Sequence, residues 1–179
     1  MSTENVNGLN IVIAPGDFLC QIGPVPADSG GGGPYTLYAG SGLYSPARAI
    51  RLWGQSDGNY VLQYVETSNL PRTWPNSPLD PSEVTWVTFW ATNTAYNEVG
   101  DLGPNNYLTL QDDGNFVVYD LNKAVGDVPG GAIWASNTAG NPGAFLRLQD
   151  DGNLIITAQS GQVVWTSQTS VAESRGANV

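Results

Sequence analysis

The chain has 179 residues, of which 41% are hydrophobic, 22 are glycine and 12 are proline. Its 16 acidic and 6 basic side chains give a formal net charge of -10, which argues against nucleic acid and anionic membranes as partners. The length fits one domain, and the glycine and proline content favours an all-β fold of short strands and turns. Because histidine, the commonest general base, is absent, we expect no enzyme and no catalytic residue.

The N-terminal segment, residues 1–34, contains one apolar stretch, Leu9–Ala14, which predicts a β-strand. It lacks the basic and apolar regions of a signal peptide, so we expect a soluble chain that stays in the cytoplasm or leaves by a leaderless route. No run approaches the roughly 18 apolar residues of a membrane span, so no membrane insertion is expected. Cys20 has no disulfide partner and is interpreted as a small buried side chain, and the glycine-rich stretch 28–34 predicts a flexible linker.

A nine-residue pattern begins at Gln55, Gln111 and Gln149, and its clearest copy is QDDGNFVVY at 111–119. Each copy places Gln, Asp and Asn two residues apart around an Asp-Gly turn and continues into an apolar strand, which predicts a β-hairpin. In a three-residue loop closed by a left-handed glycine, Gln111 lies opposite Asn115. Three copies of such a pattern indicate a repeated architecture.

Alternation along each hairpin separates an apolar face from a polar one. In the second copy the register places Thr109 opposite Val117 and Tyr107 opposite Tyr119. We expect the apolar face to form the core and the polar face to meet ligand or solvent. The apolar faces of the second and third copies consist of Leu108, Leu110, Phe116, Val118, Leu146, Leu148, Leu154 and Ile156.

A strand that contains tryptophan follows each copy, with WATNT at 90–94, WASNT at 134–138 and WTSQT at 165–169. The connection that precedes this strand is longest after the first copy, as expected for an insertion in a surface loop. Four prolines in 69–81 exclude a central strand there. Trp74, within this loop, either packs over the loop base or offers a ligand a stacking surface.

The pattern at 111–119, its repetition and the sequence WASNT closely resemble the bulb-type mannose-binding lectins, the snowdrop-agglutinin-like family of monocots. Residues 37–43 resemble the opening strand and turn of that family. The resemblance implies a β-prism II of three four-stranded antiparallel sheets with pseudo-threefold symmetry, one shallow mannose site per sheet, and no metal or cofactor. It covers about residues 35–170, which leaves 1–34 as an N-terminal extension and 171–179 as a flexible tail.

Carried over by motif position, Asp113 and Asn115 would hold the axial 2-hydroxyl of mannose, and Gln111 the 3-hydroxyl. Tyr119 would hold the 4-hydroxyl, while Val117 packs against the ring carbons. An amide beside a carboxylate can both donate to and accept from a hydroxyl, and two side chains that read an axial hydroxyl separate mannose from glucose. In the third copy the corresponding residues are Gln149, Asp151, Asn153 and Ile155, and Thr157 replaces the tyrosine. In the first copy they are Gln55, Asp57, Asn59 and Val61, and Gln63 replaces the tyrosine.

The same residue types also occur in other roles. The three tryptophans are interpreted as core, one per sheet along the prism axis, whereas Trp53 and Trp86 have no assigned role. A lone Asp-Gly-Asn is ordinary turn chemistry, but the outward Gln, Asn and Tyr are not required by a turn. Adjacent aspartates in a turn point apart, so 112–113 and 150–151 are not interpreted as glycosidase pairs, and the downstream ligands of a calcium loop are missing. Since the motif side chains face outward, we expect Asn115→Ala to leave folding intact.

The sequence therefore predicts a lectin for terminal mannose or mannose-rich glycans and glycoproteins. Each site would bind with affinity on the order of millimolar, so we expect a multivalent homo-oligomer of two or more copies. Two alternatives stay open. One is a degenerate prism that serves as a protein-interaction module, as Gln63 and Thr157 suggest, and the other is a defence or antimicrobial effector that targets surface glycans.

Overall fold

The structure is a computed structural model that describes residues 2–6, 9–13, 21–22, 35–46, 49–66, 84–95, 105–125 and 128–170. Several predictions fall outside these ranges. They concern Cys20, the linker 28–34, the proline-rich loop 69–81 with Trp74, and the tail 171–179. The described part contains β-strands and no helix long and apolar enough to cross a membrane.

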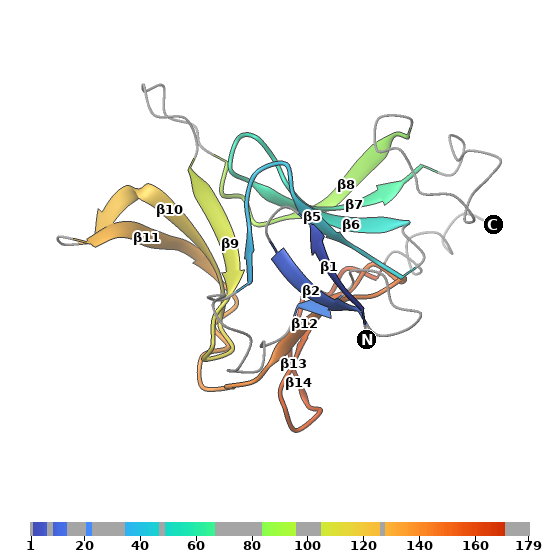
Figure 1. Ribbon diagram of the computed structural model, residues 1–179. Helices are drawn as coiled ribbons and strands as arrows, with labels where there is room; N and C mark the ends of the chain where they lie inside the picture. The colour runs from blue at the N-terminus through green and yellow to red at the C-terminus, as the bar shows by residue number, and fades with distance from the viewer. Residues whose placement is uncertain are drawn as a thin grey trace.

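Each motif hairpin is the centre of one four-stranded antiparallel sheet, and the three sheets surround a common centre in Figure 1. The first sheet contains β5 (Gly42–Tyr44), β6 (Ile50–Gly54), β7 (Tyr60–Val65) and β8 (Trp86–Ala91). The second contains β4 (Tyr35–Leu37), β9 (Asn106–Leu110), β10 (Phe116–Val125) and β11 (Val128–Ala135). The third contains β3 (Gln21–Ile22), β12 (Phe145–Leu148), β13 (Leu154–Thr157) and β14 (Val163–Thr166). The all-β architecture predicted from the sequence is confirmed.

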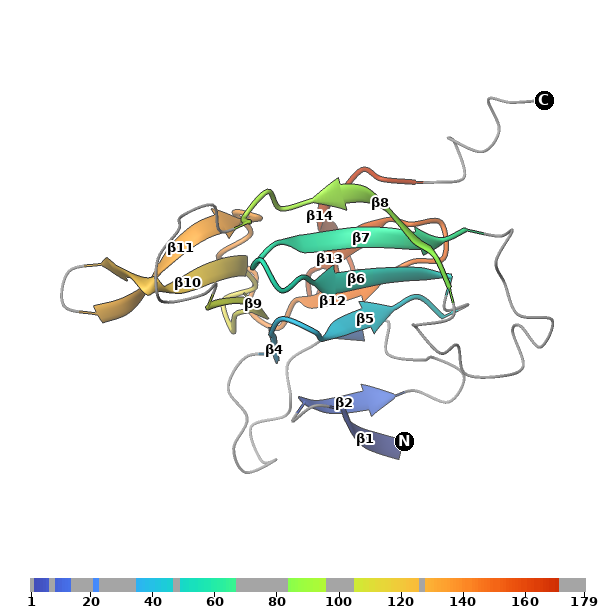
Figure 2. The ribbon, with the colours of Figure 1, turned by 90° about the horizontal axis from the view of Figure 1, so that it is seen from above.

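The N-terminal segment contributes more than the single strand predicted for it. The predicted strand is present as β2 (Leu9–Ile13), and β1 (Ser2–Val6) pairs with it in a hairpin that lies to one side of the three sheets in Figure 2. In addition, β3 pairs with β12 through Ile22 and Leu146 at the edge of the third sheet. The domain boundary at residue 35 stays a prediction, although one strand of that sheet comes from before it.

The three Asp-Gly turns fold alike. In the second hairpin the Gln111 N–H donates to the Asn115 carbonyl at 2.8 Å, and the Gly114 N–H donates to the Gln111 carbonyl at 2.9 Å. The same pair of bonds closes the turns at 55–59 and 149–153. Gly114 has φ +86°, and a Cβ there would also clash with the Asn141 carbonyl oxygen, so no other residue fits. The predicted three-residue loop is confirmed.

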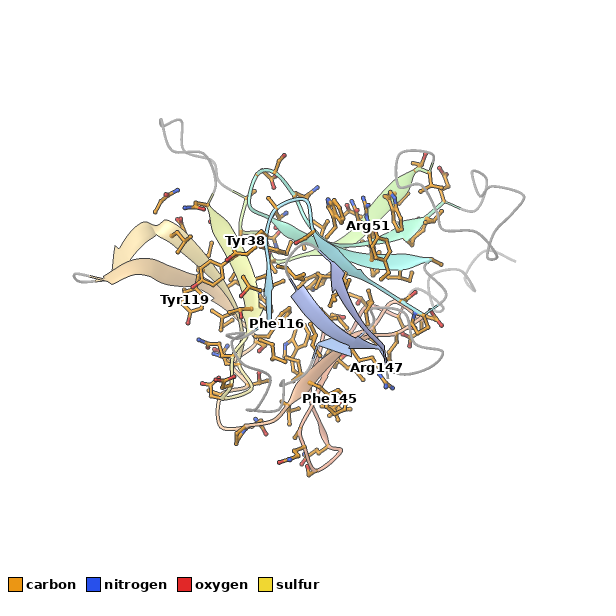
Figure 3. All side chains as sticks on the ribbon, in the orientation of Figure 1. Tyr38, Arg51, Phe116, Tyr119, Phe145 and Arg147 are labelled. Atoms are coloured by element: carbon orange, nitrogen blue, oxygen red, sulfur yellow. The ribbon has the colours of Figure 1, made fainter. Side chains whose placement is uncertain are left out.

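The apolar faces of the three sheets meet in one core. Every inward side chain predicted for the second and third hairpins is at most 4% exposed. Phe116 lies at the centre of the molecule in Figure 3. Burial of these side chains supplies most of the driving force for folding, at about 25 cal/mol per Å² of apolar surface removed from water.

The tryptophans that follow the hairpins complete this core. Trp90, Trp134 and Trp165 contact one another in edge-to-face pairs with ring centroids 6.0 to 6.3 Å apart, and all three pack against the buried cluster. Each indole is half-buried. One indole comes from each sheet and packs against the core, as predicted, whereas their place along the prism axis stays a prediction.

Candidate functional site

A polar network behind each turn explains why the tryptophan strand carries hydroxyl residues. The Asn115 Oδ1 accepts the Thr138 N–H at 3.1 Å and lies 3.4 Å from the Ser136 hydroxyl. The Thr138 hydroxyl donates to the Gly114 carbonyl at 2.6 Å. Asn137 between them has φ +59°, which lets the chain turn back onto the hairpin. The same bonds recur around Asn59 and Thr94 and around Asn153 and Thr169.

This network fixes which atoms of the motif face outward. Because its oxygen is bonded internally, Asn115 has its amide nitrogen left as a donor, and that nitrogen has no bond within the described residues. Asp113 accepts the Asn115 N–H with Oδ1 at 2.9 Å, which leaves its second carboxylate oxygen for other partners. Our expectation for Asn115→Ala changes accordingly, since the substitution also removes a bond that holds the tryptophan strand to the turn.

The remaining motif residues of the second hairpin share the same outer face. The Gln111 Nε2 donates to the Tyr119 hydroxyl at 2.8 Å, and the predicted register is confirmed, with Val117 opposite Thr109 and Tyr119 opposite Tyr107. Val117 is only 1% exposed. Its methyl groups therefore offer almost no surface to a ligand, and the predicted contact with the ring carbons of mannose stays a prediction.

The sequence placed Tyr107 opposite Tyr119, but it did not reveal that this row of tyrosines continues to Tyr38. The rings of Tyr119 and Tyr107 are stacked with centroids 5.3 Å apart, and Tyr38 lies 6.2 Å from Tyr107. Burial raises the pKa of Tyr107, with smaller contributions from Tyr119 and Tyr38, as expected for phenols that share one surface. The signal for Tyr38 was its place directly after the inward-facing Leu37, which turns it outward.

The first hairpin has the same turn but a different outer face. Gln63, in the place of Tyr119, accepts from the Arg51 Nε at 2.7 Å and donates to the Thr88 hydroxyl at 3.0 Å. The Arg51 guanidinium lies 4.4 Å from the ring centre of Trp53 and 4.0 Å from that of Trp86, which gives both tryptophans a role. Arg51 is 8% exposed, and burial lowers its pKa.

The third hairpin differs again at the same positions. Thr157, in the place of Tyr119, is 8% exposed and pairs with Phe145. Ile155 lies opposite Arg147, and Figure 3 places Phe145 and Arg147 on this third sheet. The turn itself is conserved in structure, because the Asn153 N–H donates to Asp151 at 2.8 Å as in the other copies.

The chemistry offered by the second hairpin is that of neutral amides and hydroxyls beside one carboxylate. Such groups hydrogen-bond hydroxyl groups in either direction. Within the described ranges, no group of three or more His, Cys, Asp or Glu side chains could hold a metal ion. The predictions of a metal-free and cofactor-free site stay predictions.

Known proteins resemble this chain in structure, although the sequence comparisons found no match. No family model matches the chain, and no curated protein matches it. A solved monomeric monocot mannose-binding lectin from Gastrodia elata is 25% identical, has a TM-score of 0.52, and aligns over 85% of this chain and 99% of its own. The chain is a bulb-lectin-like protein. The β-prism II fold that the motif predicted is thereby confirmed.

Two further structures resemble this bulb-lectin-like protein. The Japanese Marasmius oreades lectin has the same fold, with a TM-score of 0.54 and 23% identity over 85% of this chain and 92% of its own. A lectin from Allium sativum is 32% identical over 74% of this chain and 93% of its own, with a TM-score of 0.45. The Gastrodia elata structure is that of a mannose-binding lectin, which agrees with the prediction that the chain is not an enzyme.

Proposed function

We propose that this protein binds carbohydrate, and that the outer face of its second hairpin binds a terminal mannose of glycans or glycoproteins without a metal ion. One observation carries the proposal: Gln111, Asp113, Asn115 and Tyr119 lie on one face with their free donors and acceptors fixed by internal bonds. The similarity to a mannose-binding lectin from Gastrodia elata supports it.

Recognition of an axial hydroxyl follows from the fixed orientation of Asn115. With Oδ1 held by the Thr138 N–H, the amide nitrogen is the group that meets the ligand. It donates to the sugar hydroxyl while the free carboxylate oxygen of Asp113 accepts from it. An epimer with an equatorial hydroxyl leaves both groups poorly paired, and this is the physical basis for preferring mannose to glucose.

The affinity of one such site is expected to be weak. About four hydrogen bonds at roughly 1 kcal/mol net each are offset by the lost freedom of the sugar, so the Kd is on the order of millimolar. Useful binding then requires several sites engaged together. We keep the proposal of a homo-oligomer of two or more copies as the source of that multivalency.

We rank the three copies by their outer faces. The second retains all five motif positions. In the third, the positions Gln149, Asp151, Asn153 and Ile155 remain candidates, but a buried Thr157 replaces the tyrosine. In the first, Gln63 already has both ends of its amide bonded, so Gln55, Asp57, Asn59 and Val61 form the weakest candidate.

A matched pair of variants tests the proposal. Asn115→Asp and Asn59→Asp each keep an oxygen for the threonine N–H of their network and remove the amide donor. Titration of the parent with methyl α-mannoside, followed by site-resolved NMR, is expected to give saturable shifts at 111–119. Methyl α-glucoside is expected to give smaller shifts, and EDTA is expected to leave the mannoside shifts unchanged.

The two variants are expected to behave differently. Asn115→Asp abolishes the shifts at 111–119, whereas Asn59→Asp retains them. Retention of mannoside binding by a folded Asn115→Asp variant would overturn the assignment of this site. Absence of any mannoside response in the parent protein would favour the alternative in which the prism is a protein-interaction module.

A further inference from the structure

The tyrosine row of the second sheet extends beyond the proposed mannose site. Tyr119 is a member of that site, Tyr107 lies opposite it on β9, and Tyr38 follows β4 at the edge of the sheet. Because Leu37 pairs with Leu108, the register places Tyr38 beside Tyr107. The row leads from the site towards the β4 edge, and Figure 3 shows Tyr38 and Tyr119 on this sheet.

Tyr38 is an unusually exposed aromatic ring. It is 57% exposed, and among the described residues only Val163 is a comparably exposed large hydrophobic side chain. Isolated apolar side chains on a surface are common, but this one is continuous with a polar site and packs against its neighbour in the row. An aromatic ring in that position offers apolar surface next to groups that bind hydroxyls.

The backbone holds Tyr38 in place. Its N–H donates to the Ser41 hydroxyl at 3.0 Å, and that hydroxyl donates to the Tyr38 carbonyl at 2.6 Å. Gly40, at φ +78°, donates its N–H to the Gly54 carbonyl at 2.8 Å, which ties the turn to β6. A ring on a turn fixed at both ends loses little freedom when a ligand covers it.

The tyrosine row consists of neutral side chains. Thr109 lies next to Tyr107 in the outer face of β9, but its hydroxyl is buried and is not exposed to a ligand. No basic side chain is in the row, and the chain carries a net charge of -10, so an anionic ligand is disfavoured. These features suit a neutral ring that has both hydroxyl groups and apolar C–H faces.

We propose that Tyr38, positioned by Tyr107, is a second subsite that contacts the apolar face of the next pyranose ring in an oligosaccharide. The terminal mannose of that oligosaccharide occupies the site at 111–119, so the inference rests on the proposed function. The subsite makes the protein a reader of at least two linked sugars, with the second residue lying towards the β4 edge.

The experiment compares methyl α-mannoside with α1-2-, α1-3- and α1-6-linked dimannosides by NMR titration of the full chain. The parent is expected to bind at least one dimannoside about 3- to 10-fold more tightly than the monosaccharide, the range expected for one aromatic contact. Tyr38→Ala is expected to remove that advantage while leaving the monosaccharide affinity unchanged. Tyr38→Phe is expected to keep it, because the ring remains.

Two results would overturn the subsite. One is a parent that binds none of the dimannosides more tightly than methyl α-mannoside, and the other is a folded Tyr38→Ala variant that keeps the full advantage. Failure of the proposed function gives a different result, since methyl α-mannoside then shows no binding at 111–119 in the parent.

Discussion

The first and second hairpins have the same turn and different outer faces. In both, an asparagine oxygen accepts a threonine N–H, and an aspartate accepts the asparagine N–H. At the ninth motif position, however, Gln63 bonds Arg51 and Thr88, whereas Tyr119 bonds Gln111 and stacks on Tyr107.

The shared turn residues therefore support the fold, whereas the residues that differ determine what the outer face can bind. The Asn of the motif joins the hairpin to its tryptophan strand, and the Asp accepts the Asn N–H within the turn, so their presence alone does not indicate a ligand. In the proposed function, the binding face is distinguished by the ninth motif position and by the residue opposite it on the neighbouring strand. The residue opposite the ninth position is Arg51 in the first sheet and Tyr107 in the second. The first sheet therefore has an internally bonded cluster on its outer face, and the second has a row of aromatic rings.

The largest expected effect is on the stability of the core that the three sheets share. Trp134 contacts Trp90, Trp165 and Phe116 in this core. Trp134→Ala is expected to lower the free energy of unfolding by about 3 to 5 kcal/mol, as for an aromatic removed from a packed core. Denaturant unfolding measures this. If stability were unchanged while mannoside binding disappeared, the indole would be a ligand contact and the core assignment would be wrong.

The turn network gives the next largest effect, and it should be equal in the two hairpins. Asn59→Ala and Asn115→Ala each leave a threonine N–H without its acceptor and are expected to cost about 1 to 3 kcal/mol of stability. Chemical denaturation of the two variants, with Asn59→Asp and Asn115→Asp as controls that keep an acceptor, measures it. A variant as stable as the parent would show that the network does not support the fold.

The first and second hairpins also differ in the core, because the sixth motif position is Tyr60 in the first and Phe116 in the second. The Tyr60 hydroxyl lies 2.7 Å from the Leu37 carbonyl and 3.1 Å from that of Asn106, so Tyr60→Phe is expected to cost about 0.5 to 1.5 kcal/mol. Burial raises the pKa of Tyr60 above its unfolded value of about 10.

That direction predicts a pH dependence. The contribution of Tyr60 is fully present below pH about 10 and is lost as the pH rises towards the folded value, because only the unfolded phenol ionises in between. Unfolding measured from pH 8 to 11 is expected to show a fall in stability that is smaller in Tyr60→Phe. An identical fall in both proteins would contradict this account of the pKa.

The smallest expected effect distinguishes the two ninth positions directly. Tyr119→Phe removes one hydroxyl from the proposed site and is expected to weaken methyl α-mannoside binding by about 0.5 to 1.5 kcal/mol. Gln63→Ala is expected to leave mannoside binding at 111–119 unchanged, although it breaks the bonds to Arg51 and Thr88. Isothermal or NMR titration of both variants measures the contrast, and equal losses would mean that the ninth position does not set the difference.

The sequence predicted the features that repeat, because three copies fix the turn glycine, the register and the inward face. It did not predict the dual role of Asn115, since the Thr138 N–H belongs to another strand. The Arg51, Gln63 and Thr88 cluster was missed for the same reason, because it draws on β6, β7 and β8. The two-residue strand β3 is too short to show alternation, and only its pairing with β12 defines it.

The most direct test follows the side-chain amide signals of Asn59 and Asn115 in one titration with methyl α-mannoside. The two groups lie in equivalent turns of the same molecule, so each is the control for the other. Binding through the outer face of the second hairpin predicts a saturable shift at Asn115, with a midpoint on the order of millimolar, and little change at Asn59. Equal shifts at both, or a shift at Asn59 alone, would contradict the claim that the face beyond the shared turn determines sugar binding.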